Sequence, residues 1–573
     1  MNALMTTGAR DIPRPRTTET RRNLPRLNAA TRHLCAGVYL DAAFRDRILR
    51  DVFNDNKRRP APAYGFDPIP VLHHAWRSWC LDLFQHLVIS TTMITIVVWR
   101  PLIAVFVGSL TLVWWSGRQF SGLLRARWRY LLDRSGRMYG ADLHRHSRFI
   151  ARILAVGLLF LGATIAILAT SHHTGRWLVQ GNIIEASAAI LTPLLANAAI
   201  AAARQLMLDA VFEETARDPA ARLQPRLEVL DAYRAHAYTI YGGYRPFIGS
   251  GRRVRAWSFV QRLVPPEKVL AKLGHDTDRY TEYRTPPFRT GQLVEYLHEQ
   301  IQALREESDP EVRLPGLRVA DHVFIEGTAA PRFVPAFASD EATATAHVMA
   351  NPTDAARHYL ACHIESWEGE VFTSVFVHVS LQGRTLYLEF STYALTPTCR
   401  AFHVIDSIGE TGRAARLRAA LSSVKRTPQL LFAPAKMVAA LRVLLGSIRS
   451  SRDLTLEARR GVNIGARFSP REEAVWRPEQ RNEDPDERAD DAPDIDYFQL
   501  GDINKHSQII ERRLLATVAD FLQTNNVDTS EFWQRATTIL NNGVISTGSN
   551  NTIVNGSTVG AGATFTNSGS PQN

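Results

Sequence analysis

Four apolar stretches within residues 83–203 constrain the fold of this chain more than any other feature. Residues 150–170 are the strongest, because their one charge, Arg152, lies near the start, where its long side chain can reach the interface. Residues 180–203 are weaker: alanine dominates them and Glu185 lies near one end, so a buried helix of a soluble protein is the alternative. The pattern predicts an α-helical membrane region that has the lipid bilayer as its partner.

The first stretch, residues 83–115, is longer than one span needs and contains Arg100 followed by Pro101. A charge at mid-bilayer costs at least about 2.5 kcal/mol, whereas proline suits the first position of a helix. We therefore expect a helical hairpin of segments 84–99 and 101–115, with one kinked span as the alternative.

The loop at 116–148 contains eight arginines and two aspartates, which predicts a cytoplasmic location for it. The turn at 171–177, which joins the last two segments, then lies outside, and the residues after 203 return to the cytoplasm. The expected localisation is the inner (plasma) membrane, multi-pass, with both termini cytoplasmic. The four cysteines lack CxxC spacing and fit a reducing compartment.

The net charge of +11 lies mainly in residues 1–148, around the apolar segments. Membrane topology explains this excess, so nucleic acid is not an expected partner. Residues 1–32, rich in Arg, Thr and Pro, are predicted to be a disordered basic arm, and residues 33–82 a cytoplasmic helical region.

Residues 204–470 are predicted to form a cytoplasmic α+β domain. Apolar spacing favours helices up to about Glu307, and β-branched and aromatic residues then favour an antiparallel meander over 316–406. Glu368-Gly369 and residues 382–384 occupy hairpin positions in this meander, whose last expected strand is AFHVID. Helices are expected again at about 411–423 and 428–450.

A glycine- and arginine-rich loop, residues 241–259, is the candidate anion-binding site of the domain. Its backbone could form a nest beside guanidinium groups, and the candidate residues are Gly249, Gly251, Arg252, Arg253 and Arg255. No GxGxxG follows a strand and no Walker lysine is present, so a purely structural loop is the alternative.

Several potential ligands or catalytic groups lie on or beside the predicted strands, but none shows HExxH, CxxC or GxSxG spacing. They are His358, His363, His378, His403, Cys362, Glu365, Glu389 and Asp406. Strand alternation would send several of them to opposite faces. The sequence therefore predicts no catalytic residue, no metal site and no cofactor.

Residues 471–496 contain eleven acidic and four basic residues and are predicted to be a solvated linker. A helical hairpin is expected over 497–541, with an apolar stripe on its first helix. The predicted fold class is thus a membrane α-helical N-terminal region, a cytoplasmic α+β domain, a C-terminal helical hairpin and a low-complexity Asn/Gly/Ser/Thr tail.

The tail, residues 542–573, has no charged residue. Its glycine content favours disorder, whereas its asparagines, its β-branched residues and the absence of charge also suit stacked β layers. The predicted self-association residues are Val544, Ile545, Asn550, Asn551, Ile553, Val554 and Asn555.

Three segments resemble pieces of a family of uncharacterised multi-pass membrane proteins of actinobacteria: PFIGSG…WSF, ARHYLACHIESWEGEVFTSVFVHVSLQGRTLYLEF and DTSEFWQRATTILNNGVI. The resemblance covers most residues from about 85 to 560. It implies a membrane region followed by a soluble domain and supplies no catalytic residue. The tail is similar to the short amyloid signalling sequences of bacteria, in which one motif templates another.

The leading hypothesis is a non-enzymatic, membrane-anchored signalling or interaction protein whose tail associates with its own copies. One alternative is a membrane enzyme that acts on a lipid headgroup or a nucleotide at the loop 241–253. Another is a small oligomeric channel. The absence of catalytic spacing disfavours the enzyme, and the absence of a chain of intramembrane carboxylates disfavours a transporter.

Overall fold

The fold was obtained as a computed structural model. It describes these residues: 27–55, 57–99, 101–132, 153–163, 165–166, 176–212, 227, 230, 236–266, 282–283, 285–407, 409–424, 433–452, 463–475 and 495–541. The predicted self-association residues and most of the predicted acidic linker lie outside these ranges. So does the greater part of the predicted basic arm.

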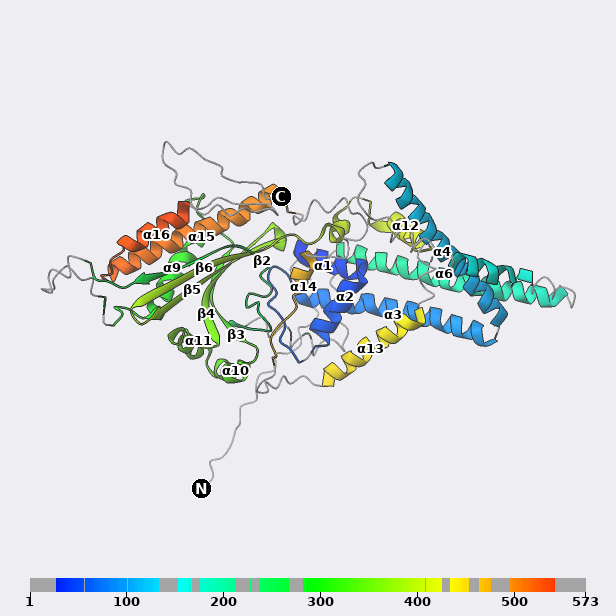
Figure 1. Cartoon of the computed structure of the whole chain (residues 1–573), viewed down its shortest axis with the longest axis horizontal. Coiled ribbons are helices and arrows are strands. Elements are labelled where there is room, and N and C mark those ends of the chain that lie inside the picture. The colour runs from blue at the N-terminus through cyan, green and yellow to red at the C-terminus, as the bar shows by residue number, and fades with distance from the viewer. Residues whose placement is uncertain are drawn as a thin grey trace, which may run out of the picture.

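A six-stranded sheet, in the order β1-β3-β4-β5-β6-β2, forms the centre of the C-terminal half (Figure 1). Its strands are β1 (Tyr238–Tyr241), β2 (Arg252–Arg262), β3 (Leu317–Glu326), β4 (Ala356–Ser366), β5 (Val371–Gln382) and β6 (Thr385–Leu395). β1 pairs with β3 in parallel, and every other pair is antiparallel. The predicted sheet domain is confirmed, and its meander is β3 to β6.

Three expectations for this domain were wrong. Residues 241–259, predicted to be a loop between helices, contain the end of β1 and most of β2, which form the two edges of the sheet. The expected last strand is the 3-10 helix η7 (Arg400–Asp406), because Phe402 and Ile405 are buried against the N-terminal helices instead of extending the sheet. The C-terminal hairpin is not a separate unit, since Ile510 and Leu514 belong to the same apolar core as the strands.

Helices cover one face of the sheet. They are α9 (Thr290–Gln302), the 3-10 turn η5 (Ala303–Arg305), α10 (Ala330–Ser339), α11 (Glu341–Ala350), α15 (Tyr497–Thr524) and α16 (Ser530–Asn541). Alternation along β4 sends Leu360, Cys362 and Ile364 into the core beneath α9 and α15. The opposite face carries Tyr359 and His363 and is the face on which the candidate site lies.

The N-terminal helices α1 (Ala29–Leu40) and α2 (Ala42–Ile48), with the π turn η2 (Leu49–Phe53), lie between the sheet and the apolar helices (Figure 1). The side chain of Asn28 caps α1 by accepting a hydrogen bond from the Thr31 N–H. Leu34 and Phe44 are fully buried in a second core with η7. The predicted basic arm therefore ends before residue 27, not at 32.

Three long helices extend away from the sheet: α3 (Pro68–Trp99), α4 (Pro101–Leu132) and α6 (Arg176–Phe212) (Figure 1). α3 ends and α4 begins on either side of Arg100, as the hairpin interpretation requires. Among the described residues, two helices are long and apolar enough to cross a membrane, α3 and the 187–211 part of α6. The described parts of two further apolar helices, at 103–117 and 153–163, are shorter than this.

A polar layer joins α3 and α6 where the exposed apolar surface of α3 begins. Arg45 Nη1 lies 2.5 Å from Asp82 Oδ2, and Arg204 pairs with the same carboxylate. The predicted boundary between a cytoplasmic region and a membrane region at 82–83 therefore falls inside one helix, because α3 continues through this layer. Two residues later in the sequence, Phe84 is 59% exposed.

Three further helices follow η7: α12 (Gly412–Val424), α13 (Ala433–Arg452) and α14 (Pro470–Val475). α14 corrects the predicted start of the acidic linker, because Arg471 is fully buried and Ala474 belongs to the second core. The charged segment therefore begins after residue 475.

Candidate ligand-binding site

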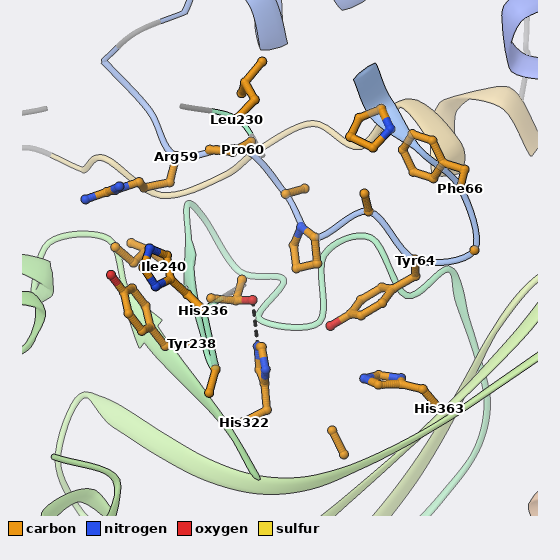
Figure 2. Close-up of a pocket in the computed structure, with 18 of the residues that line it drawn as sticks. Arg59, Pro60, Tyr64, Phe66, Leu230, His236, Tyr238, Ile240, His322 and His363 are labelled. Carbon is orange, nitrogen blue, oxygen red and sulfur yellow. Dashed lines mark hydrogen bonds between the residues drawn. The ribbon is translucent and has the colours of Figure 1, made fainter. Parts of the chain in front are cut away.

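A cavity of about 470 Å³ lies between the sheet and the segment that enters α3. One wall is formed by residues 59–66 together with Pro68 and Leu72 of α3. The other wall is formed by β1, β3 and β4, which contribute side chains from their helix-free face. Two stretches far apart in the sequence therefore share one pocket (Figure 2).

Tyr64 forms the aromatic side of this pocket. Its ring stacks on Phe372 at 5.4 Å between centroids and lies 4.7 Å from the ring of His363. Figure 2 shows its hydroxyl directed toward the middle of the cavity. That buried hydroxyl has no hydrogen-bond partner among the described residues, and burial raises the pKa of Tyr64. A bound molecule could therefore satisfy it.

Two imidazoles from the sheet, those of His322 and His363, also line the pocket. A 2.8 Å hydrogen bond joins His322 Nε2 to Thr239 Oγ1, and a 3.1 Å bond joins His363 Nδ1 to Ser374 Oγ. Burial lowers the pKa of His322 to about 4 and that of His363 to about 3, with smaller contributions from nearby positive groups. Both rings are thus neutral near pH 7 and can either donate or accept a hydrogen bond.

The charged groups of the pocket are largely balanced. Arg318 Nη2 lies 3.4 Å from Glu365 Oε2, and Asp321 accepts a 2.8 Å bond from His358 Nε2 on the helix-covered face. Aromatic rings, neutral imidazoles and a free phenol suit a small planar polar molecule without a strong charge. The Thr239–His322 pair has no orienting carboxylate among the described residues, so a hydrolytic triad is not assembled there.

A buried acid–base network lies next to this pocket and joins α1 to the sheet. Glu370 accepts a 2.6 Å bond from His33 Nδ1, and Thr398 donates its backbone N–H at 2.7 Å. Burial alone would raise the pKa of Glu370. The hydrogen bond from His33 and the charge of Arg471 overcome it and lower the pKa from 4.5 to about 2.

The same network contains residues that could hold a metal ion. Ligand atoms of His33, His403 and Asp406 all lie within 4.8 Å of one another. In this arrangement His33 Nε2 instead forms a 2.6 Å hydrogen bond with Asp406, and its ring stacks on His403 at 3.9 Å. The group therefore acts as a closed polar clamp, and a cation would have to replace the His33–Asp406 bond.

The predicted anion-binding residues do not form one site. The N–H groups of Gly249 and Gly251 donate to Glu472 Oε1 at 2.9 and 3.1 Å, so the nest holds a carboxylate of the chain itself. Arg252 and Arg253 are exposed, while Arg255 forms a 2.9 Å ion pair with Glu511 on the helix-covered face. Regular alternation would place Arg253 and Arg255 on one face, and the β-bulge between them explains why Arg255 points to the other face.

A second cavity of about 350 Å³ lies around Glu472, and arginines contribute to its lining. Arg245 Nη2 lies 3.1 Å from Glu472 Oε2, so this carboxylate balances part of the positive charge. The predicted loop thus provides an internal anion site, with Gly251 and Arg252 among its lining residues.

The residues that build the main pocket and the clamp were mostly missed by sequence reasoning. Tyr64, His33 and Glu370 belong to no spaced motif, and only the fold brings them to the sheet. His363 and Asp406 were among the considered residues, but alternation and distance place them in different sites. The one weak sign of the pocket in the sequence was His363, a histidine within a predicted strand that lies on the helix-free face of β4.

Residues 256–555 match the protein family described as AbeC-like domain. The match covers 300 of the 573 residues and extends from β2 through α16. It includes the β3, β4 and β5 side of the pocket and excludes β1, residues 59–66 and α3. No curated protein and no solved structure matches the chain.

Proposed function

The chain belongs to the AbeC-like domain family, and we propose that it is a membrane-anchored, non-enzymatic signalling protein. In this proposal a small molecule binds the pocket, binding changes the arrangement of α3, and the C-terminal tail associates with the tails of other copies of the chain. The tail, residues 542–573, lies outside the described part of the chain.

One observation carries the proposal: Pro68 and Leu72 of α3 line the same cavity as His322 and His363. α3 is one of the two helices long and apolar enough to cross a membrane. A ligand that contacts both walls would bind one arrangement of α3 more tightly than another, and this difference in affinity is what a sensor requires.

The membrane part of the proposal keeps the predicted topology. Residues 116–148 were predicted to be a loop, but α4 continues through 132. The arginines of this segment favour the cytoplasmic side, and the termini are proposed to lie there as well. The apolar helices at 103–117 and 153–163 would then complete a multi-pass region. The resemblance to actinobacterial membrane proteins leads us to expect relatives in actinobacteria with the same order of membrane region and soluble domain.

Filling the pocket should change α3. Ala320 is an exposed residue of β3 on the pocket wall, so Ala320→Trp places an indole in the cavity without displacing a core side chain. The indole should pack against residues 59–66 and the beginning of α3 and favour one arrangement of this helix. Alkylation of the exposed Cys80 on α3 should therefore slow by about twofold or more. The measurement is maleimide labelling of the full chain in detergent, in a Cys399→Ala background.

Ala320→Ser is the matched control, because it changes polarity at the same position without filling the cavity, and it should label like the parent. Equal labelling rates for the Trp and Ser variants would contradict a link between pocket and helix. Melting temperatures of the variants show whether the fold is retained.

The tail should assemble by itself. A peptide of residues 541–567 is expected to form thioflavin-positive fibrils, because layers stacked at about 4.8 Å align Asn550, Asn551 and Asn555 with their own copies. Val544→Lys with Ile553→Lys should abolish the fibrils by stacking like charges in every layer. The control peptide, Val544→Ile with Ile553→Val, should still form them. A wild-type peptide that stays monomeric at high concentration, with or without a seed, would remove this part of the proposal.

A further inference from the structure

The segment from residue 411 to 452 has an unusual charge composition. It contains nine basic residues and no acidic residue. Its two helices, α12 and α13, form what we call the basic helix pair. Three exposed cations of this pair, Arg413, Lys436 and Arg442, have no carboxylate partner among the described residues. A surface of this kind attracts an anionic partner.

The exposed side of the basic helix pair is also apolar. Leu417 and Leu421, one turn apart on α12, are each 63% exposed, and Leu445 on α13 is 64% exposed. Val438 and Leu441 extend the α13 stripe at helical spacing. The opposite side of α13 packs through Val443 and Leu444 against the second core, so the exposed stripes are not needed to hold the helices in place.

The basic helix pair lies beside the two helices proposed to enter the membrane. α12 follows α6: the Gly412 N–H donates to Asp209 at 3.2 Å, and Asn197 Nδ2 donates to the Ser423 carbonyl at 2.5 Å. Asn197 also accepts a 2.8 Å bond from Gln85 of α3. The end of α12 is therefore level with Gln85, close to where α3 begins to expose apolar side chains.

On the other side of the bundle, α13 packs along α3 and η2. Asn54 Nδ2 donates to the Val443 carbonyl at 3.3 Å. α13 thus lies beside α3 and η2. Figure 1 shows the two helices on opposite sides of α3 and α6, near the sheet-proximal end of the bundle.

We propose that the basic helix pair binds the anionic lipid surface of the leaflet from which α3 and α6 emerge. Its leucines and valines insert at the headgroup level, and its unpaired cations contact lipid phosphates. Basic residues beside exposed apolar residues are typical of interfacial helices. The surface is continuous with the exposed side chains of α3, which favours lipid over a soluble protein. The inference rests on the proposed function in one respect, because α3 must insert.

The test uses the full chain in nanodiscs, with Cys80 and Cys399 replaced by serine and alanine. A bimane probe is attached at Leu421→Cys or Leu445→Cys, and its quenching by doxyl-labelled lipid is measured. We expect quenching in nanodiscs that contain phosphatidylglycerol and phosphatidylcholine to exceed that in phosphatidylcholine alone by about twofold or more. A probe at Tyr497→Cys, an 83% exposed residue of α15, should not be quenched.

Charge dependence is tested with the triple variant Arg413→Gln, Lys436→Gln and Arg442→Gln, which should lose the extra quenching in phosphatidylglycerol. The matched control is Arg305→Gln, Arg313→Gln and Arg512→Gln, three exposed arginines of the sheet domain, which should keep it. Equal behaviour of the two triple variants would overturn the inference.

A probe at Val98→Cys on α3 separates the two proposals. If Val98 is quenched and both surface probes are not, the inference about the basic helix pair is wrong while the membrane anchor stands. If Val98 is not quenched, α3 does not insert, and the proposed function fails together with this inference.

Discussion

Replacing Arg471 by alanine is expected to lower the free energy of unfolding by about 3–5 kcal/mol, which lowers the melting temperature by roughly 3–4 °C. Arg471 is fully buried, and its Nη2 donates to the carbonyls of Glu370 at 2.7 Å and of Thr396 at 2.9 Å. The alanine variant leaves the buried Glu370 carboxylate with less compensating charge. Thermal unfolding of the full chain in detergent measures the effect.

Acid should reveal the same interaction. The pKa of Glu370 in the folded chain is lower than in the unfolded chain, so this carboxylate stabilises the fold above about pH 4.5. Its contribution is lost as the pH falls through about 2. Without Arg471 the folded pKa moves up toward 4.5, so the contribution of this carboxylate should be smaller and should be fully lost at a higher pH.

Two comparisons make the Arg471 prediction specific. Arg332→Ala removes an exposed arginine that pairs with Asp354 at 2.7 Å, and should cost less than about 1 kcal/mol. The double variant Arg471→Met with Glu370→Gln removes both charges and should recover part of the stability, because a buried pair can often be replaced by neutral groups. A loss for Arg471→Ala no larger than that for Arg332→Ala would show that the interaction of Arg471 with Glu370 is dispensable for stability.

Replacing Phe376 by alanine is expected to cost about 3–5 kcal/mol. Phe376 is fully buried on the pocket face of β5 and stacks on Phe247 at 4.6 Å. It also contacts the rings of Phe324 at 5.5 Å and Tyr393 at 6.0 Å, so it joins strands β3, β5 and β6 to the loop after β1. Removing the ring leaves a cavity in the layer beside the candidate pocket.

Phe376→Leu keeps most of the volume and should cost clearly less than the alanine variant. Tyr497→Ala is the matched aromatic control, because its side chain is 83% exposed, and should change stability by no more than about 0.5 kcal/mol. Thermal unfolding of all three variants gives the comparison. A cost below about 1 kcal/mol for Phe376→Ala would mean that this aromatic layer is not a core.

Local patterns in the sequence determined the elements whose contacts are periodic. The Arg100-Pro101 pair located the end of α3 and the start of α4, but not the start of α3 at Pro68 or the end of α4 at Leu132. Residue composition and alternation located β3 to β6. The two helices at 497–524 and 530–541 followed from their stripes and from the Asp528 turn. These features depend on residues close together in the chain, so the local sequence is enough to predict them.

The edges of the sheet were not determined locally. β1 has four residues, too few for a periodic signal, and β2 exposes an arginine-rich face that resembles a loop in composition. Pairing with β3 and β6 makes them strands, because neighbours in the sheet satisfy their backbone groups. The opposite error occurred at AFHVID, which was predicted to be a strand and is a 3-10 helix. Burial of Phe402 against the N-terminal helices favours this conformation.

The sites were decided by tertiary structure alone. His33 and Glu370 are separated by 337 positions, and the pocket joins Tyr64 to His322, which are 258 positions apart. The loop at Gly249 has the composition of an anion site, but only the fold shows that Glu472 supplies the anion. Sequence alone thus indicated the long apolar helices and the central strands, because their signals are local. The positions of the buried charges and of the cavity required the packing of distant segments.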